Sequence, residues 1–313
     1  MTLSFDGLMA EIIARLVAGT PPWRQAWSSA GADPREPLRS NGEPFTGSNA
    51  WLLSFAGAVA GYASPYWFTF RQALDIGAPV AKGAKATPAI LYKTRVVEDE
   101  APAEAEGEDA EARVLRFLKI YGVFNAEQLT DCPAAFLRAP PVDPGVRAAT
   151  RNAVLDAIPS RVEFAGGTPC YIPVLDLIRM PAPERFRSVE DFLATKAHEQ
   201  LHWSGAEHRL ARAFGRRYGD EAYAFEELVA EIGAAALGLR IGLPPQMLDD
   251  HAAYLGHWVK ILKDRPGALL EASGHAQRAV DYLLAFSQGG GPAGGQSEGP
   301  AEGAHPELSE ALL

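Results

Sequence analysis

The amino-acid sequence predicts an α+β protein with a small mixed N-terminal domain and a mostly helical C-terminal domain. The chain has 313 residues, and because one domain typically holds about 150 residues, two domains are expected. Strand-like apolar runs lie on both sides of an acidic segment near position 100, whereas helical spacing of apolar residues dominates the second half. The chain is 47% hydrophobic and 22% charged, which excludes collagen-like and wholly disordered proteins.

The first domain is expected to span residues 1–130. It begins with a helix, continues through a Pro- and Trp-rich loop (PPWRQAW) and a turn-rich segment (RSNGEPFTGSN), and ends in a helix and a small sheet. Residues 47–70 carry no charge, but glycines and a Ser-Pro pair interrupt them. A spanning helix needs about 20 sustained apolar residues. This segment therefore predicts a buried helix followed by a turn, and no membrane contact is expected.

An acidic insertion at about residues 97–112 divides the sheet of this domain. The run VVEDEAPAEAEGEDAEA lacks apolar periodicity and is typical of a disordered segment. Its two flanks, AILYKTRVV and RVLRFLKIYGVF, both have strand character. We expect these flanks to pair in one hairpin.

A proline-rich linker is expected at 131–145, before a second domain at 146–287. This domain begins with a helix at 146–157, followed by the strand-like pieces RVEFAGG and CYIPVLDLIRM and then three helices, the last ending near Phe286. Residues 288–313 are rich in Gly and Pro and predict a flexible tail.

Charge is distributed unevenly along the chain. The net charge is −10, but residues 1–128 contain 12 Lys or Arg against 15 Asp or Glu, and eight of those acids fall within 98–111. Without these eight, the first domain carries a balance of +5. That balance is compatible with a polyanionic partner and equally with a mildly basic surface of no special function.

The cysteine content and the first residues predict a cytoplasmic protein. There are two cysteines and no CxxC pair, which argues against a disulfide framework and against a thiolate zinc site. Asp6 and Glu11 interrupt what would be the apolar region of a signal peptide.

The strongest chemical motif is HEQLH at positions 198–202. Ser188 is a suitable N-cap and apolar residues follow at helical spacing, so residues 189–203 predict one helix that ends at Gly205. On that helix His198 and His202 project from the same face and can bind one metal ion. Glu199 is placed to act as a general base on a water molecule at that ion, the pattern of an HExxH zinc site.

Two candidates exist for the third metal ligand. His208 completes the spacing HExxHxxGxxH, in which the glycine lets the chain turn back toward the ion. Glu227 lies on a later alanine-rich helix, YAFEELVAEIGAAALG, with Glu231 one turn further on. Buried carboxylates need a cation or a hydrogen-bond donor. We prefer Glu227 as ligand and Glu231 as the acceptor behind a ligand histidine, with His208 as the alternative.

Several segments together resemble the ArdC-type antirestriction proteins of plasmids and other mobile elements, some of which are fused to conjugative primase-like proteins. The N-terminal segments are PPWRQAW, SNGEPFTGSNAWLL, WFTFRQALDIGAPVAKGAKAT and YGVFNAEQL, and the C-terminal ones are HEQLHWSGAEHRLAR, YAFEELVAEIGAAALG and AAYLGHWVKILKD. The resemblance covers nearly the whole chain except the acidic insertion and the tail. The insertion departs from the family pattern, and we expect it to weaken DNA binding.

The resemblance implies a domain that binds single-stranded DNA, followed by a zincin-like metallopeptidase domain. Carried over to this sequence, it implies His198 and His202 as zinc ligands, Glu199 as the general base and Glu227 as the third ligand. The protein or peptide substrate is not implied. The alternative is a non-catalytic protector of single-stranded DNA with a structural zinc site, which has no need of a carboxylate at position 199.

Aromatic and basic side chains of the first domain are candidates for single-strand binding, which combines base stacking with phosphate contacts. We expect Trp51 and Trp67 to belong to the core. The candidate contacts are Trp23, Arg24, Trp27, Arg39, Arg71, Lys82 and Lys85.

Overall fold

The computed structural model describes residues 5–19, 36–97, 113–138, 144–214, 221–243 and 255–288, which form an α+β protein as predicted. The α-helices are α1 (Phe5–Val17), α2 (Ser48–Ala60), α3 (Phe70–Asp75), α4 (Ala134–Leu137), α5 (Pro144–Ala157), α6 (Val189–Ser204), α7 (Glu221–Ile241), α8 (Leu255–Asp264) and α9 (Ala268–Ser287). The strands are β1 (Leu38–Arg39), β2 (Tyr66–Thr69), β3 (Thr87–Val97), β4 (Arg113–Asn125), β5 (Arg161–Phe164), β6 (Cys170–Ile172) and β7 (Leu177–Met180).

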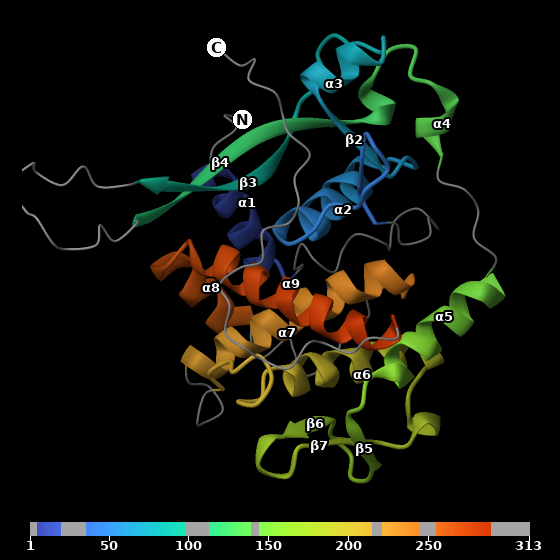
Figure 1. The fold of residues 1–313 in the computed structure, drawn as a ribbon, viewed down its shortest axis with the longest axis vertical. Coiled ribbons are helices and arrows are strands. Elements are labelled where there is room, and N and C mark those ends of the chain that lie inside the picture. The colour runs from blue at the N-terminus through green and yellow to red at the C-terminus, as the bar shows by residue number, and fades with distance from the viewer. Residues whose placement is uncertain are drawn as a thin grey trace, which may run out of the picture.

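The N-terminal sheet has four strands in the order β1-β2-β4-β3. Strands β3 and β4 pair antiparallel from Thr87 opposite Val123 out to Val97 opposite Arg113, so the predicted hairpin is confirmed. The acidic residues 98–112 lie outside the described part of the chain. Figure 1 shows this long hairpin extending away from the helices.

The predicted buried helix is α2, with Trp51 and Leu53 in the core. A turn follows this helix at Gly61, as predicted, and strand β2 then begins at Tyr66. This strand pairs with β1 on one side and with β4 on the other. Four residues are too few to show a strand period by themselves, so its pairing partners define it. None of the described helices is long and apolar enough to cross a membrane.

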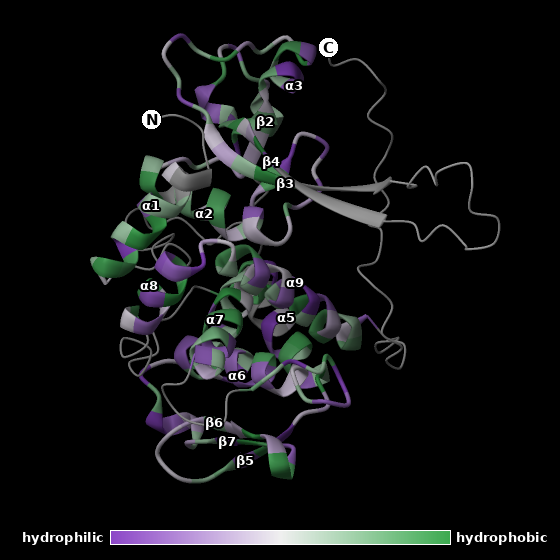
Figure 2. Cartoon of the chain, turned by 90° about the vertical axis from the view of Figure 1, so that its left-hand side faces the viewer, coloured by the Kyte–Doolittle hydropathy of each residue, from purple (hydrophilic) through white to green (hydrophobic). Residues whose placement is uncertain are grey.

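The C-terminal half combines a three-stranded sheet, in the order β5-β7-β6, with a group of helices. The described residues after β7 form four helices of at least ten residues, α6 to α9, instead of the three predicted. Helices α8 and α9 are separate because the chain turns at Arg265–Gly267, where Pro266 has no backbone N–H to continue a helix. In both views the helices lie between the two sheets (Figure 1 and Figure 2).

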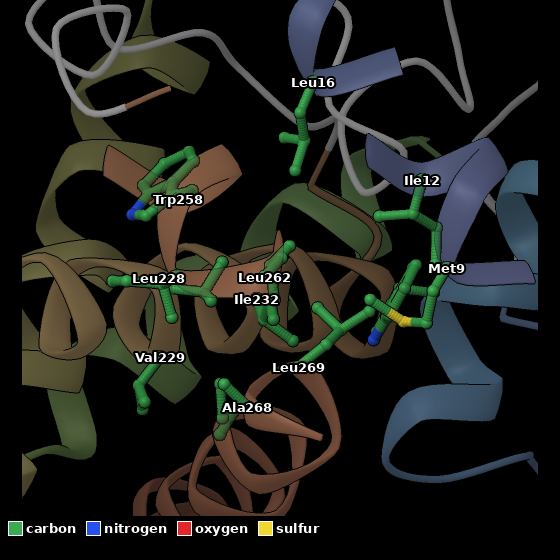
Figure 3. Packing of buried hydrophobic residues seen from close by; sticks show 14 of the residues in the cluster. Met9, Ile12, Leu16, Leu228, Val229, Ile232, Trp258, Leu262, Ala268 and Leu269 are labelled. Atoms are coloured by element: carbon green, nitrogen blue, oxygen red, sulfur yellow. The ribbon is translucent and has the colours of Figure 1, made fainter. Parts of the chain in front are cut away.

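One large core cluster joins the two halves of the chain. Met9, Ile12 and Leu16 of α1 pack with apolar residues of α7, α8 and α9, as Figure 3 shows. The indole N–H of Trp258 on α8 donates a hydrogen bond to the carbonyl oxygen of Ala224 on α7 at 3.0 Å. The domain boundaries at 130 and 145 stay a prediction, and the N-terminal helix shares its core with C-terminal helices.

Helix α7 packs closely against the helix that carries the HExxH motif. A Cβ atom on Gly233 would lie 2.6 Å from Cδ1 of Leu201 on α6. Apolar residues on one side of α7 join the core around α1, and those on another side join the core around α6 and β7. This close approach brings side chains of α7 to the histidines of α6.

Candidate metal centre

Helix α6 begins and ends where the sequence predicts, within one residue. The hydroxyl of Ser188 accepts a hydrogen bond from the backbone N–H of Asp191 at 3.0 Å, and Gly205 is the C-cap. His198, Glu199 and His202 are all buried on this helix. The burial follows from the packing of α6 between α7, α9 and the small sheet, which removes this face from water.

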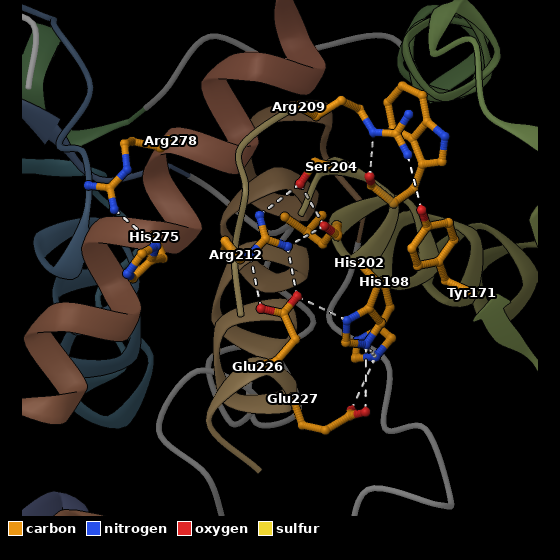
Figure 4. Close-up of polar contacts among 12 residues, drawn as sticks. Tyr171, His198, His202, Ser204, Arg209, Arg212, Glu226, Glu227, His275 and Arg278 are labelled. Carbon is orange, nitrogen blue, oxygen red and sulfur yellow. Dashed lines mark hydrogen bonds and ion pairs between the residues drawn. The ribbon is translucent and has the colours of Figure 1, made fainter. Parts of the chain in front are cut away.

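Three side chains converge on one point, as Figure 4 shows for His198, His202 and Glu227. The two Nε2 atoms are 3.0 Å apart. The Glu227 carboxylate places one oxygen 3.5 Å from Nε2 of His198 and the other 3.7 Å from Nε2 of His202. Ligand atoms around a tetrahedral zinc ion lie about 3.3 Å apart, as follows from bond lengths near 2.05 Å. These three residues therefore fit one divalent metal ion.

Electrostatics of the cluster also favour a cation. Burial by itself would lower the pKa of His202, but the carboxylates of Glu227 and Glu226 raise it to about 10. Burial opposes ionisation of Glu227, yet His202 and His198 hold its pKa well below the usual range. The two carboxylates thus stabilise positive charge at this point, which is what a bound metal ion supplies.

Glu199 lies beside the cluster and interacts with both of its histidines. Burial raises the pKa of its carboxyl group, while His198 and His202 act in the opposite direction. The backbone N–H of Tyr171, on strand β6, donates a hydrogen bond to this carboxylate. Glu199 is therefore tied to the small sheet.

The two candidate third ligands are in different places. Glu227 is in the cluster, whereas the side chain of His208 is 65% exposed and lies 3.7 Å from a carboxylate oxygen of Asp176. Glu231 lies behind the cluster, with Oε1 3.8 Å from Nδ1 of His198. The structure thus brings Glu227 and Glu231 to His198 and leaves His208 at the surface.

Sequence reasoning missed two buried residues behind His202. Its Nδ1 lies 3.2 Å from Oε1 of Glu226, which also accepts hydrogen bonds from Arg212. The adjacent glutamates at 226 and 227 were a signal that two acids of α7 approach α6. Arg212, in the loop after α6, offered no local signal.

A second polar cluster fixes the turn between β6 and β7 against the end of α6. The guanidinium of Arg209 stacks on the Trp203 ring, 3.8 Å from its centroid, and donates hydrogen bonds to Asp176 and to the hydroxyl of Tyr171. Asp176 adopts a left-handed backbone conformation, with φ of 45°. Sequence reasoning missed this cluster, which keeps β6 beside the HExxH helix.

The candidate DNA-binding residues do not gather in one described site. Trp23, Arg24 and Trp27 lie outside the described residues. Arg39 is half-buried on β1, where its guanidinium lies over the Phe45 ring, 5.1 Å from the centroid. The expectation that Trp51 and Trp67 belong to the core is confirmed, because they are only 1% and 2% exposed.

Three basic candidates lie on one stretch of the first half. Arg71 lies on α3, where its Nε atom is 3.5 Å from Oδ1 of Asp75, one helical turn further on. Lys82 and Lys85 lie in the loop between α3 and β3. All three side chains are exposed, so this stretch carries positive charge at the surface.

Comparisons with known proteins match both halves of the chain. Residues 5–124 match the N-terminal domain of the anti-restriction factor ArdC, and residues 149–275 match a zincin-like metallopeptidase family. The fold and the site therefore define a zincin-like metallopeptidase domain preceded by an ArdC-type domain.

Two solved structures resemble this chain over nearly its whole length. It is 36% identical to the metal-free antirestriction protein ArdC from plasmid R388, with a TM-score of 0.75 over 91% of this chain and 98% of that one. The Mn(II)-bound structure of the same protein gives 35% identity, a TM-score of 0.73, and coverage of 90% and 97%. This chain belongs to the ArdC antirestriction family. The predicted metal cofactor is confirmed, because the family domain is zincin-like and the relative binds a metal.

Curated relatives differ in length. A DNA primase TraC from Escherichia coli is 33% identical over 305 residues, which are 91% of this chain and 20% of the primase. A second TraC is 33% identical over 299 residues, or 27% of its length. The chain therefore spans about a fifth to a quarter of these relatives. A protein of Sinorhizobium fredii is 30% identical, with 90% of this chain and 91% of the relative covered.

Proposed function

We propose that this protein binds single-stranded DNA and cleaves a protein or peptide substrate with a zinc-dependent peptidase site, as an antirestriction protein of a mobile element. The observation that carries the peptidase half is Glu199. Its carboxylate is buried next to the two histidines and accepts a hydrogen bond from the backbone of β6. A metal site with a purely structural role has no need of an acid at this position.

Each residue of the cluster has a chemical role in this proposal. His198, His202 and Glu227 would hold the metal ion, which supplies a Lewis acid that polarises a carbonyl group and acidifies water. Glu199 takes a proton from the attacking water as its oxygen bonds to the peptide carbonyl carbon. The same carboxyl group then delivers that proton to the leaving nitrogen as the C–N bond breaks.

Strand β6 is the element best placed to align a peptide substrate. It lies at one edge of the three-stranded sheet, whereas β7 is the central strand. Of the two strands formed by CYIPVLDLIRM, only β6 is therefore at an edge of the sheet. An extended peptide can add to such an edge through backbone hydrogen bonds. Because Tyr171 on β6 is hydrogen-bonded to Glu199, a peptide along β6 would run past the general base.

The DNA half of the proposal rests on the family and on surface positive charge. Arg71, Lys82 and Lys85 would contact phosphates, and the residues of the PPWRQAW loop would stack on bases. We further place the protein in the cytoplasm, which agrees with the two free cysteines, Cys132 and Cys170.

A second candidate is a non-catalytic DNA protector with a structural metal site. The burial of His198, His202 and Glu227 favours it, since structural metal sites are closed to solvent. The two candidates differ in whether a substrate is cut.

The decisive experiment compares the wild type with Glu199→Gln for metal content and for cleavage of labelled casein, with and without single-stranded DNA. Loss of the general base should slow cleavage by about 100- to 10,000-fold while metal content stays at the wild-type value. Glu190→Gln, at the far end of the same helix, is the matched control and should cleave normally. A metal-loaded wild type that cuts neither casein nor itself under any condition would favour the structural candidate.

A further inference from the structure

A buried ion pair lies directly behind His202. Arg212 and Glu226 are both buried, and two guanidinium N–H groups of Arg212 donate to the two carboxylate oxygens of Glu226, at 2.9 and 2.7 Å. Arg212 also donates to the hydroxyl of Ser204 at 3.0 Å and to the carbonyl oxygen of Leu201 at 2.6 Å. These bonds hold the guanidinium in one position against the end of α6, as Figure 4 shows.

Glu226 connects this ion pair to the histidine. Its Oε1 atom, which accepts from Arg212, lies 3.2 Å from Nδ1 of His202, while Nε2 of the same ring faces His198 and Glu227. A carboxylate is an acceptor only, so the Nδ1 atom of His202 must carry the proton of this bond. A proton on Nδ1 leaves the lone pair of a neutral imidazole on Nε2, the atom that faces the cluster.

Gly205 provides the space for the guanidinium. Its φ is −82°, a conformation open to any residue, so the backbone does not require glycine here. A Cβ atom at this position, however, would lie 2.7 Å from Nη2 of Arg212 and 2.8 Å from Cζ of Phe214. The glycine in HExxHxxG therefore makes room for Arg212. The chain after this glycine leaves the alternative ligand, His208, at the surface beside Asp176.

We propose that Arg212 and Glu226 are positioning residues for the metal site. They set the ring orientation and the Nδ1 proton of His202, and the negative charge of Glu226 strengthens Nε2 as a donor. Such partners behind a metal-binding histidine typically change metal affinity by about 10- to 100-fold. The inference rests on the proposed role of His202 as a ligand, and Gly205 contributes to it by leaving space.

The competing explanation is a structural one, in which the ion pair only ties the loop after α6 to α7. A double variant, Glu226→Leu with Arg212→Met, distinguishes the two explanations. Replacing both members of a buried ion pair by apolar residues of similar size is often neutral for stability. It nevertheless removes the acceptor at Nδ1 of His202. A structural pair predicts unchanged metal affinity in a folded double variant, whereas positioning residues predict a loss.

The measurement is zinc affinity by competition with a chromophoric chelator, together with thermal unfolding of the metal-free protein. We expect the double variant to stay folded and to bind zinc about 10- to 100-fold more weakly. The matched control is Glu36→Leu with Arg240→Met, which removes an ion pair at the other end of α7. Its zinc affinity should equal that of the wild type.

The outcomes distinguish this inference from the proposed function. Wild-type zinc affinity in a folded double variant would overturn the positioning role and leave the metal site intact. A wild type that binds no zinc would overturn the proposed metal site and this inference with it. Should the double variant fail to fold, Glu226→Gln keeps the side-chain size and removes the charge. Weaker zinc binding by that variant supports the inference, and equal binding overturns it.

Discussion

The metal centre and the candidate DNA surface differ in how their residues are brought together. His198 and His202 lie one turn apart on one buried helix, and Glu227 reaches them from the helix packed against it. Arg71, Lys82 and Lys85 instead lie on a short helix and a loop at the surface, and the tryptophan candidates lie outside the described residues. Helix pitch and close packing determine the first arrangement. The second depends on surface charge, which constrains geometry much less.

The two regions are nevertheless connected through α7. Leu228 and Ile232 of this helix belong to the core shared with α1, and Ala230 and Leu237 belong to the core around α6. Because the N-terminal helix packs on the C-terminal helices, tests of either region should use the full chain. An isolated segment 1–130 would expose the apolar face of α1.

The largest expected effect is the loss of metal when a shared ligand is removed. His202→Ala should reduce a content of about one zinc ion per chain to near zero, because two donors alone make a weak site. Elemental analysis after gel filtration measures it. Full metal content in the variant would mean that the buried cluster is not the metal site. The comparison of a packed metal centre with a loosely arranged DNA surface would then no longer hold.

Two single variants test which residue is the third metal ligand. Glu227→Ala should lower zinc affinity strongly, since its carboxylate lies within 3.7 Å of both histidines. His208→Ala should leave affinity unchanged, since that side chain is exposed and beside Asp176. Chelator competition measures both. The opposite ranking would show that the loop after α6 supplies the ligand and that α7 only packs against it.

A substitution of Gly205 tests whether the residues behind the metal centre are closely packed. Gly205→Ala should destabilise the metal-free protein by about 1–3 kcal/mol, because its Cβ crowds Arg212 and Phe214. Gly256→Ala on α8 is the control, since nothing lies within 4 Å of its Cβ position. That variant should be neutral or stabilising by about 0.4–1 kcal/mol. Urea denaturation measures both, and equal midpoints would contradict the crowding.

The smallest effect is expected at the DNA surface. Replacing Lys82 and Lys85 by alanine should weaken binding of single-stranded DNA to the full chain. The negative slope of log affinity against log salt concentration should become shallower by about 1.4. Each phosphate that a lysine no longer neutralises reduces its magnitude by roughly 0.7. The control is Lys260→Ala with Lys263→Ala on α8. Fluorescence anisotropy over a salt series measures the slopes, and an unchanged slope in the first variant would remove this loop from the DNA surface.

Features that depend on residues close together in the chain could be predicted from the sequence. The Ser188 cap, the end of α6 at Gly205 and the shared face of His198 and His202 all follow from hydrogen bonding and pitch within one helix. The β3–β4 hairpin is predictable for a similar reason, because two apolar runs flank one acidic segment. The boundary between α8 and α9 was missed although a local signal, Pro266, was present.

Contacts between residues far apart in the chain could not be predicted in the same way. Glu227 and His208 were both compatible with the sequence, and the packing of α7 on α6 brings Glu227 to the histidines and leaves His208 exposed. The contacts of Arg212 with Glu226, and the need for glycine at 205, likewise arise between segments that are not neighbours along the chain. Such contacts depend on how whole helices pack, and local spacing carries no information about which helix faces will meet.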